Sequence, residues 1–205
     1  MGRNVGPKCR LCRREGEKLF LKGPKCYTEK CPVTRRNSTP GLQPRGRRRQ
    51  SQYAIHLREK QKLKRIYGVR EAQFRTYVAV AKRAKGVTGD RILELLESRL
   101  DSILYRGGMA ASRDQARQLI NHGHIWVNER RVDIASFLAK AGDVVSVKEA
   151  SRGKKGVQSM VSEHQRKLTS WLERQNGQLR VVDKPKPSEI EQEMQMSLIV
   201  EFYSR

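Results

Sequence analysis

The chain has 205 residues and a formal net charge of +23, with charged residues making up 32% and hydrophobic residues 37% of the sequence. This apolar share is low for one large compact core, and no apolar run approaches the roughly 20 residues that a membrane-spanning helix needs. The start also lacks the charged-then-apolar pattern of a signal peptide, so we expect a cytoplasmic protein with no membrane partner.

The positive charge is concentrated in the first 85 residues, which hold 25 Lys and Arg against 5 Asp and Glu. Residues 86–205 are nearly balanced, with 19 against 16. Self-repulsion on this scale destabilises a compact state unless counter-charge comes from outside. Nucleic acid is the obvious source, because each neutralised phosphate also releases condensed counterions. The charge pattern therefore predicts a polyanion-binding protein.

All four cysteines lie within the first 31 residues, in the spacing C-x2-C-x13-C-x4-C. Two such pairs can close a tetrahedron of thiolates around zinc, and four protein ligands leave no open position for a catalytic water. A disulfide pair and four free buried thiols are the alternatives, although disulfides belong to oxidising compartments. The spacing favours one structural zinc ion, with Cys9, Cys12, Cys26 and Cys31 as its ligands.

Residues 32–50 are rich in Pro, Gly and Arg and contain almost nothing apolar. Such a segment is expected to be a solvated linker in free solution. It can also order on a phosphate backbone, and the two interpretations are compatible. We expect its arginines to contact phosphates without reading bases, namely Arg45, Arg47, Arg48 and Arg49.

Three helices are predicted next. Ser51 can cap a helix that runs to about Tyr67 and ends at Gly68. Its cations recur at i, i+4 and i+7 on one face and are candidates for RNA contact: Arg58, Lys62 and Arg65. Residues 71–85 and 90–106 carry apolar stripes at helical spacing, which indicate core faces: Phe74, Tyr77, Val78 and Ala81, then Leu93, Leu96, Leu100, Ile103 and Leu104.

A further helix begins at Ser112, with Gln115 three residues later in the capping-box arrangement. Gly123 lets the chain leave this helix, and "HIWVN", "RVDI" and "DVVSV" are expected to be short strands. The unit would project a cationic shelf of Arg113, Arg117, Asn121, His122, His124, Arg130 and Arg131. The alternatives are that the arginines form an ordinary solvated helix face and that the histidines only make hydrogen bonds in the turn. The convergence of these side chains from adjacent elements instead suits recognition of RNA shape.

The stretch "SRDQARQLINHGHIWVNERRVDI…AGDVVSV" resembles the small RNA-binding domain named after small-subunit ribosomal protein four. The start "MGRNVGPKCRLCRREGEKLFLKG", the middle segments "YAIHLREKQKLKRIYGVREAQFR" and "KGVTGDRILELLESRLDSILYR", and the end "LIVEFYSR" are similar to the bacterial family of that protein throughout. The cysteine spacing is similar to its zinc-bearing variety. One departure is Asn128-Glu129 where the family's hairpin turn has Asn-Gly, which makes a type I′ turn less assured.

The resemblance implies a structural, non-enzymatic ribosomal protein that binds small-subunit ribosomal RNA, nucleates assembly of the subunit body and contributes to decoding accuracy. It implies contacts with neighbouring small-subunit proteins, protein five among them, and with messenger RNA at the channel through which it enters. Further RNA-contacting residues in the arm are expected to be Arg3, Arg13 and Arg14. The alternatives are an RNA-modifying enzyme or a stress RNA-binding protein carrying the same small domain.

The expected fold is α+β, with a zinc-stapled N-terminal arm, a helical domain and an inserted small RNA-binding domain of helices and an antiparallel sheet. The expected boundaries are residues 1–45 for the arm and basic linker, 46–96 for the helical domain, and 97–175 for the insertion, whose recognisable core is about 98–158. The C-terminal segment, about 176–205, would complete the helical domain.

Overall fold

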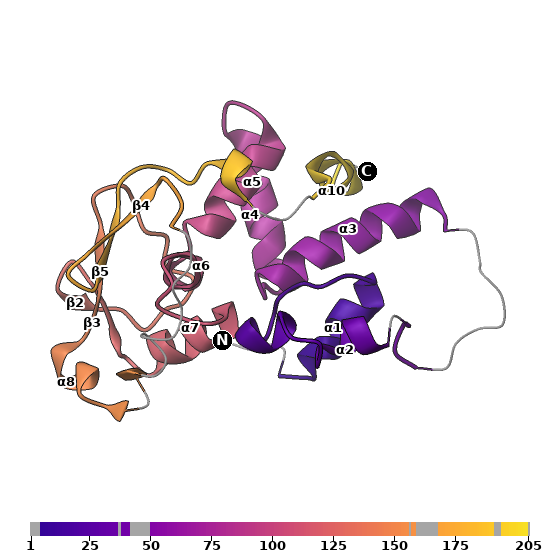
Figure 1. Cartoon of the computed structure of the whole chain (residues 1–205). Coiled ribbons are helices and arrows are strands. Elements are labelled where there is room, and N and C mark those ends of the chain that lie inside the picture. Colours follow the sequence, from indigo (N-terminus) through magenta and orange to yellow (C-terminus); the bar gives the residue numbers. More distant parts are fainter. Residues whose placement is uncertain are drawn as a thin grey trace. The chain divides into compact units, whose positions relative to one another are not determined.

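The computed structural model of the chain describes residues 5–36, 38–41, 50–155, 157–158, 168–190 and 194–204. Helices and one antiparallel sheet make up the fold (Figure 1), which confirms the predicted α+β class. The chain separates into two compact units, residues 1–92 with 192–205 (unit 1) and residues 93–191 (unit 2). Of the helices in the described ranges, none combines the length and the apolar character needed to cross a membrane.

Unit 1 is helical. It contains α1 (Lys8–Glu15), η1 (Gly23–Cys26), α2 (Pro32–Arg35), α3 (Gln52–Ile66), α4 (Glu71–Arg83), the start of α5 (Thr88–Glu97) and α10 (Met196–Phe202). The predicted cap is confirmed, because the Ser51 hydroxyl accepts a hydrogen bond from the Ala54 amide. The predicted apolar stripe of α4 is also confirmed as a buried face: Phe74, Tyr77, Val78 and Ala81.

Helix α10 packs against α3, so residues far apart in the sequence share one core. The Tyr203 hydroxyl donates a hydrogen bond of 2.7 Å to Glu71, whose carboxylate also accepts from Lys60 and Lys64 at 3.0 and 2.8 Å. Partial burial opposes ionisation of Glu71, but the hydrogen bonds from Lys64, Tyr203 and Lys60 outweigh it and hold its pKa at about 2. Burial and the Glu71 carboxylate raise the pKa of Tyr203. The carboxylate therefore stays charged at neutral pH and ties α3, α4 and the segment after α10 together.

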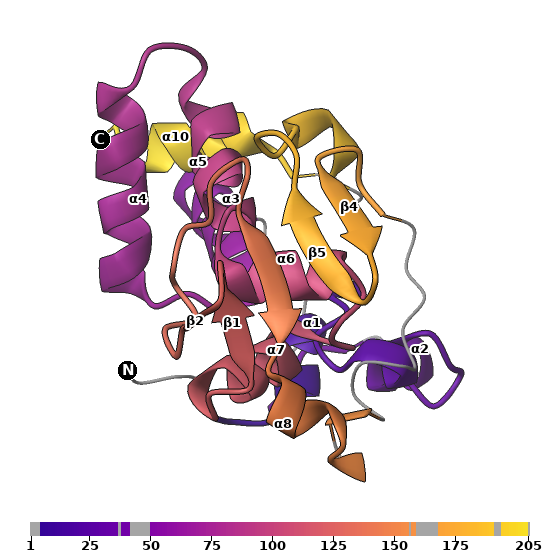
Figure 2. The same cartoon turned by 90° about the vertical axis from the view of Figure 1, so that its left-hand side faces the viewer.

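Unit 2 is a five-stranded antiparallel sheet in the order β2-β1-β3-β5-β4. Its elements are the rest of α5, α6 (Leu100–Arg106), α7 (Arg113–Asn121), β1 (Ile125–Val127), β2 (Arg130–Arg131), β3 (Val144–Val147), α8 (Glu149–Arg152), β4 (Leu172–Gln175), β5 (Gln178–Val181) and η2 (Pro187–Glu189). Figure 2 shows β1, β3, β5 and β4 side by side with α6 behind them. The register places Ile125 opposite Val147, and Val145 opposite both Val127 and Leu179.

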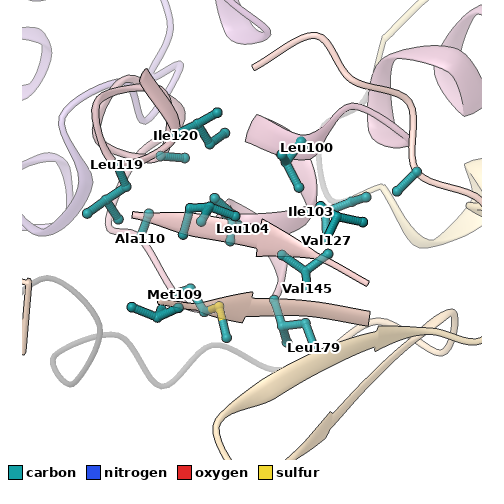
Figure 3. Close-up of a cluster of buried hydrophobic side chains, with 14 of the residues drawn as sticks. Leu100, Ile103, Leu104, Met109, Ala110, Leu119, Ile120, Val127, Val145 and Leu179 are labelled. Atoms are coloured by element: carbon teal, nitrogen blue, oxygen red, sulfur yellow. The ribbon is translucent and has the colours of Figure 1, made fainter. Parts of the chain in front are cut away.

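The core of unit 2 lies between this sheet and helices α6 and α7 (Figure 3). Leu104 from α6, Ile120 from α7, and Val145 and Leu179 from the sheet all meet there fully buried. Helix α6 ends in close contact with the sheet, since a Cβ at Gly107 would lie 2.1 Å from Cδ1 of Leu179. That position accepts only glycine without rearrangement of the core.

The expectation of one helix over residues 90–106 is wrong. Helix α5 ends at Glu97, and Arg99 is extended, with φ −67° and ψ 140°, before α6 begins. Here the backbone pairs with another segment, because the Leu100 amide donates to Phe137 O and the Ala139 amide to Ser98 O. These bonds replace helical bonds, while the apolar spacing continues because both helices bury one face.

Strands β4 and β5 form a hairpin that the sequence-based interpretation missed. The two-residue turn Asn176-Gly177 has positive φ values of 49° and 74°, as a type I′ turn requires. Asn-Gly is a strong hairpin signal and was available in the sequence. The strand before it has only Leu172 buried, so alternation was absent there.

Candidate nucleic-acid interface

Arg117 and Arg113, two arginines assigned to the cationic shelf, lie in ion pairs inside unit 2. Arg117 Nε donates to Asp101 Oδ2 at 2.7 Å, and Arg99 donates to both oxygens of the same carboxylate at 3.0 and 2.7 Å. The Asp101 side chain is completely buried, and those of Arg99 and Arg117 are 3% and 9% exposed. A charge pair this deep fixes α7 onto α6.

Arg113 is held by a second buried acid. Its guanidinium donates to Glu97 Oε1 at 3.2 Å and to Ser102 Oγ at 3.1 Å, and it stacks 4.4 Å from the centre of the Tyr105 ring. Arg106 reaches the same Glu97 oxygen at 2.8 Å. The expectation that Arg113 and Arg117 project from an exposed helix face is therefore wrong, because buried carboxylates hold both side chains. Their carboxylate partners come from neighbouring elements, which a reading of α7 alone does not reveal.

A group of polar and cationic side chains lies where α7 ends and the hairpin begins. Asn121, His122, Arg130 and Arg131 are exposed, and His124 is half-buried. Gly123 turns with φ +70°, and a Cβ there would meet Arg131 Nε at 2.7 Å. The Arg131 guanidinium thus lies directly over the turn between the two histidines.

Two lysines, Lys148 and Lys154, also lie near His124 beside this turn. Its Nδ1 lies 3.0 Å from Ser151 Oγ, and its ring centre lies 6.1 Å from that of His122. Burial lowers the pKa of His124, and the positive charges of Lys154, His122 and Lys148 lower it further. Sequence reasoning missed both lysines, because they follow β3 and only the pairing of β3 with β1 brings them here. We define His122, His124, Arg131, Lys148 and Lys154 as the turn cluster.

The turn at Asn128-Glu129, which precedes Arg130 and Arg131, has type I′ geometry although its sequence lacks the usual Asn-Gly. Asn128 and Glu129 have φ values of 47° and 64°, as a type I′ turn requires. The Asn128 side chain holds the turn, since it donates to Asp143 at 2.7 Å and accepts from the Val144 amide at 2.9 Å. These bonds offset the cost of a positive φ at Glu129.

In unit 1, the predicted cationic face of α3 contacts the arm. Arg58 and Arg65 both pair with Glu15, whose side chain is 3% exposed, and Lys62 pairs with Glu17 at 2.8 Å. Burial raises the pKa of Glu15 against the opposing effect of the two arginines. Glu15, the last residue of α1, and Glu17, just after it, therefore pair with this cationic face. RNA contact by Arg58, Lys62 and Arg65 stays a prediction.

A cationic pocket of about 390 Å³ opens beside this contact. Its lining carries four cations and one ionised acid, so it keeps a positive charge. In the described ranges Arg70 forms no ion pair and is exposed at this pocket. A phosphate group fits this environment. The lining residues are Lys8, Leu11, Gln61, Lys64, Arg65, Gly68, Val69, Arg70 and Glu71.

The remaining arm arginines have different surroundings. Arg13 donates to the carbonyl and the hydroxyl of Ser38 at 2.9 and 3.3 Å, while Arg14 is exposed. Five predicted RNA contacts lie outside the described residues: Arg3, Arg45, Arg47, Arg48 and Arg49.

The four cysteines of the arm are free thiols, with Cys9 half-buried and the others buried. The Lys22 amide donates to Cys26 Sγ at 3.4 Å, and the Leu19 backbone bonds Cys12. Burial raises the pKa of Cys12 and Cys26, and it outweighs the backbone hydrogen bonds from Leu19 and Lys22, which lower the pKa of the two thiols. In the described ranges no three Cys, His, Asp or Glu side chains are grouped closely enough to hold a metal ion. The donor chemistry fits zinc, and zinc binding stays a prediction.

Comparison with known proteins adds independent findings. The ribosomal protein S4/S9 N-terminal domain family matches residues 3–97, and the S4 domain family matches residues 98–145. Small ribosomal subunit protein uS4A of Symbiobacterium thermophilum is 51% identical over the whole of both chains. The uS4 proteins of a Thermoanaerobacter species and of Dictyoglomus thermophilum are 52% and 53% identical, again over the full length of both chains.

Proposed function

This chain belongs to the family of small ribosomal subunit protein uS4, and we propose that its turn cluster and its cationic pocket are two places where it binds small-subunit ribosomal RNA. Members of this family are structural rRNA-binding proteins and not enzymes, and this chain is one of them. The alternative of an RNA-modifying enzyme is therefore set aside. A free-standing stress protein is disfavoured because the match extends over the whole chain.

The observation that carries the proposed site is the convergence of cations on the turn between α7 and β1. Arg131 covers this turn, and Lys148 and Lys154 lie close enough to lower the pKa of His124. Ion pairs of Arg117 with Asp101 and of Arg113 with Glu97 fix α7 in place, and they therefore also fix the turn that follows it. Preorganised cations of this kind suit contact with the phosphates and 2′-hydroxyls of folded RNA.

Replacing Arg131 and Lys148 together with Ala is expected to weaken binding of cognate RNA by at least about tenfold. Charge-assisted hydrogen bonds contribute on the order of 1.5–3 kcal/mol each, though rarely additively, and each factor of ten is about 1.4 kcal/mol. The dependence of affinity on salt should flatten by roughly 0.7–0.9 per lost contact. Fluorescence titrations of labelled small-subunit RNA at several salt concentrations measure both quantities.

Lys140 and Lys184 provide a matched control. Both are exposed, and they lie towards the Asp143 end of the strands, whereas the Lys148 amide bonds His124 O at the other end. Their double replacement removes the same charge and should cost much less affinity. Equal losses in the two variants would mean that net charge alone determines binding and that the turn cluster is not a site.

We also propose that Cys9, Cys12, Cys26 and Cys31 bind one structural zinc ion. Four thiols in two pairs, backbone amides directed at Cys12 and Cys26, and an arm with few apolar residues support this assignment. When bound, zinc would displace the thiol protons and cross-link the two pairs. The cross-link would supply the stability that so small a core lacks.

The full-length protein is expected to carry about one zinc per chain, and replacement of Cys26 and Cys31 with Ser should abolish it. Elemental analysis after dialysis against a weak chelator measures this stoichiometry. Replacement of Ser38, a hydroxyl in the same arm, serves as the control and should leave zinc content unchanged. Stoichiometric zinc in the double-cysteine variant would rule out the four-thiolate site.

On the resemblance to the family alone, we propose that the chain joins the small subunit early, organises its body and influences decoding accuracy. We also propose contacts with neighbouring proteins, protein five among them, and a position near the channel through which messenger RNA enters. Sedimentation in low magnesium tests ribosomal residence, because the chain should cosediment almost entirely with small subunits.

A further inference from the structure

The cationic pocket of unit 1 is larger and less polar than a phosphate group requires. Its volume of about 390 Å³ lies within the range of roughly 300–1,000 Å³ that is typical of small-molecule sites. A phosphate alone would leave most of this space empty. Leu11 and Val69 bring apolar side chains to the wall, and Gly68 brings no side chain at all. The pocket therefore has room for a ligand that carries an apolar part beside its phosphate.

The turn between α3 and α4 forms one wall of the pocket. Gly68 has φ +56°, and its amide and that of Val69 donate to the carbonyls of Arg65 and Lys64 at 3.1 and 3.0 Å. These bonds close the end of α3 tightly. Val69 is buried, whereas Arg70, the next residue, is exposed. A well-defined turn therefore places an apolar side chain and a cation in adjacent positions of the lining.

The charges of the lining are suited to one phosphate at the Arg70 end. Glu71 already accepts hydrogen bonds from Lys64 and from other side chains, and Arg65 pairs with Glu15. Arg70 has no ion-pair partner among the described residues. Helix α4 begins directly after Arg70 without a side-chain cap, so the positive end of its dipole adds to the attraction for an anion. The phosphate of a ligand therefore belongs beside Arg70.

A neutral hydrogen-bonding side chain also lines the pocket. Gln61 is half-buried and lies on the same face of α3 as Lys64 and Arg65, three and four residues before them. Its side-chain amide forms no hydrogen bond with the described residues. An amide offers both a donor and an acceptor, which complements the edge of a nucleobase, whereas an ionised phosphate can only accept.

We propose that the cationic pocket holds one nucleotide of small-subunit ribosomal RNA whose base is turned out of its stack. The base lies on Leu11 and Val69, its edge is hydrogen-bonded to Gln61, and its phosphate contacts Arg70. Unpaired bases that are splayed out and bonded along their edges are a common target of RNA-binding proteins. The proposal rests on the RNA-binding function proposed above, and it names the part of the RNA that this site takes.

The first test titrates labelled small-subunit RNA with full-length Gln61→Leu and Arg70→Ala proteins at several salt concentrations. Each replacement should weaken binding by about tenfold. Only Arg70→Ala should flatten the salt dependence, because Gln61 carries no charge. Gln52→Leu is the matched control, since Gln52 is exposed on the same helix and does not line the pocket. It should bind within about twofold of the parent protein, and thermal melting establishes that all three variants are folded.

The outcomes separate this proposal from the proposed function. Parent-like binding by either pocket variant would overturn the bound nucleotide. If Gln61→Leu alone is unaffected, the pocket takes only a phosphate, and the proposed function stands. Equal losses in Gln61→Leu and Gln52→Leu would also overturn the nucleotide, because the effect would not depend on the pocket. Failure of the parent protein to bind small-subunit RNA at all would instead overturn the proposed function.

Chemical probing of the RNA identifies the nucleotide. Dimethyl sulfate and carbodiimide modify the pairing edges of unpaired bases, and one base should be protected in the saturated parent complex. The same base should be reactive in the saturated complexes of Gln61→Leu and Arg70→Ala and protected in that of Gln52→Leu. The absence of such a base would overturn the proposal. Binding of free nucleoside monophosphates that Gln61→Leu abolishes, with RNA affinity unchanged, would assign the pocket to a free nucleotide and overturn the RNA contact.

Discussion

Replacing Asp101 with Asn should lower the free energy of unfolding of unit 2 by about 3–5 kcal/mol, which is the usual cost of removing one partner from a buried ion pair. Asp101 is fully buried and receives hydrogen bonds from two guanidinium groups, those of Arg99 and Arg117. Without the carboxylate, both charges would remain in a place with little access to water. Amide hydrogen exchange of α6 and α7, combined with thermal melting of the full chain, measures the loss.

Two controls separate this explanation from a general effect of losing an acid. Asp133 is exposed, and Asp133→Asn should change stability by no more than about 0.5 kcal/mol. Replacing Arg99, Asp101 and Arg117 together with apolar residues of similar volume should recover much of the loss, because no uncompensated charge stays buried. If Asp101→Asn were as stable as the parent protein, the buried pairing would not hold in solution.

Replacing Trp171 with Ala is the other large effect, with an expected loss of about 3–5 kcal/mol from unit 2. The Trp171 side chain is 2% exposed and belongs to the same core as Leu179 and Val181 of β5. Its carbonyl also accepts a hydrogen bond of 2.9 Å from the Val182 amide, which closes the base of the β4–β5 hairpin. Loss of the indole would leave a cavity that this short hairpin cannot fill.

Hydrogen exchange at the amides of β3 and β5 measures whether the hairpin is part of the cooperative core. Protection at both strands should fall together in Trp171→Ala, since they pair directly through Val145 and Leu179. Arg174→Ala on the same hairpin is exposed and should be nearly neutral. A Trp171→Ala protein with unchanged protection in β3 would mean that the hairpin only rests on a core that is stable without it.

Local features were the part of this fold that the sequence predicted well. Ser51 and Ser112 were identified as helix caps because their hydroxyls act within three residues, and both cap as expected. The apolar face of α7, with Leu119 and Ile120, follows directly from helical spacing and is buried. Such predictions succeed because both partners of each interaction lie in one short stretch.

The errors concern interactions between distant segments. Arg113 and Arg117 have helical spacing that is equally consistent with a solvated face, and only the position of Glu97 and Asp101, each 16 residues away, shows that both are held in ion pairs. The break at Arg99 depends on a bridge to Leu138, which leaves no trace in the local pattern. The same reasoning explains why Lys148 and Lys154 were missed: strand pairing, and not proximity in sequence, brings them to His124.

The packing of α10 on α3 has a consequence for the order in which the two units can form during synthesis. Glu71 and Tyr203, which bond each other, are 132 positions apart, so the ribosome makes one long before the other. Residues 93–191 emerge as one uninterrupted segment and can fold while the rest is still being made, as domains generally do. Unit 1 cannot complete its core until α10 has been synthesised, and until then Phe74 and the apolar face of α3 remain exposed. Nascent chains halted before residue 196 should therefore show a protected unit 2 beside a protease-sensitive first unit.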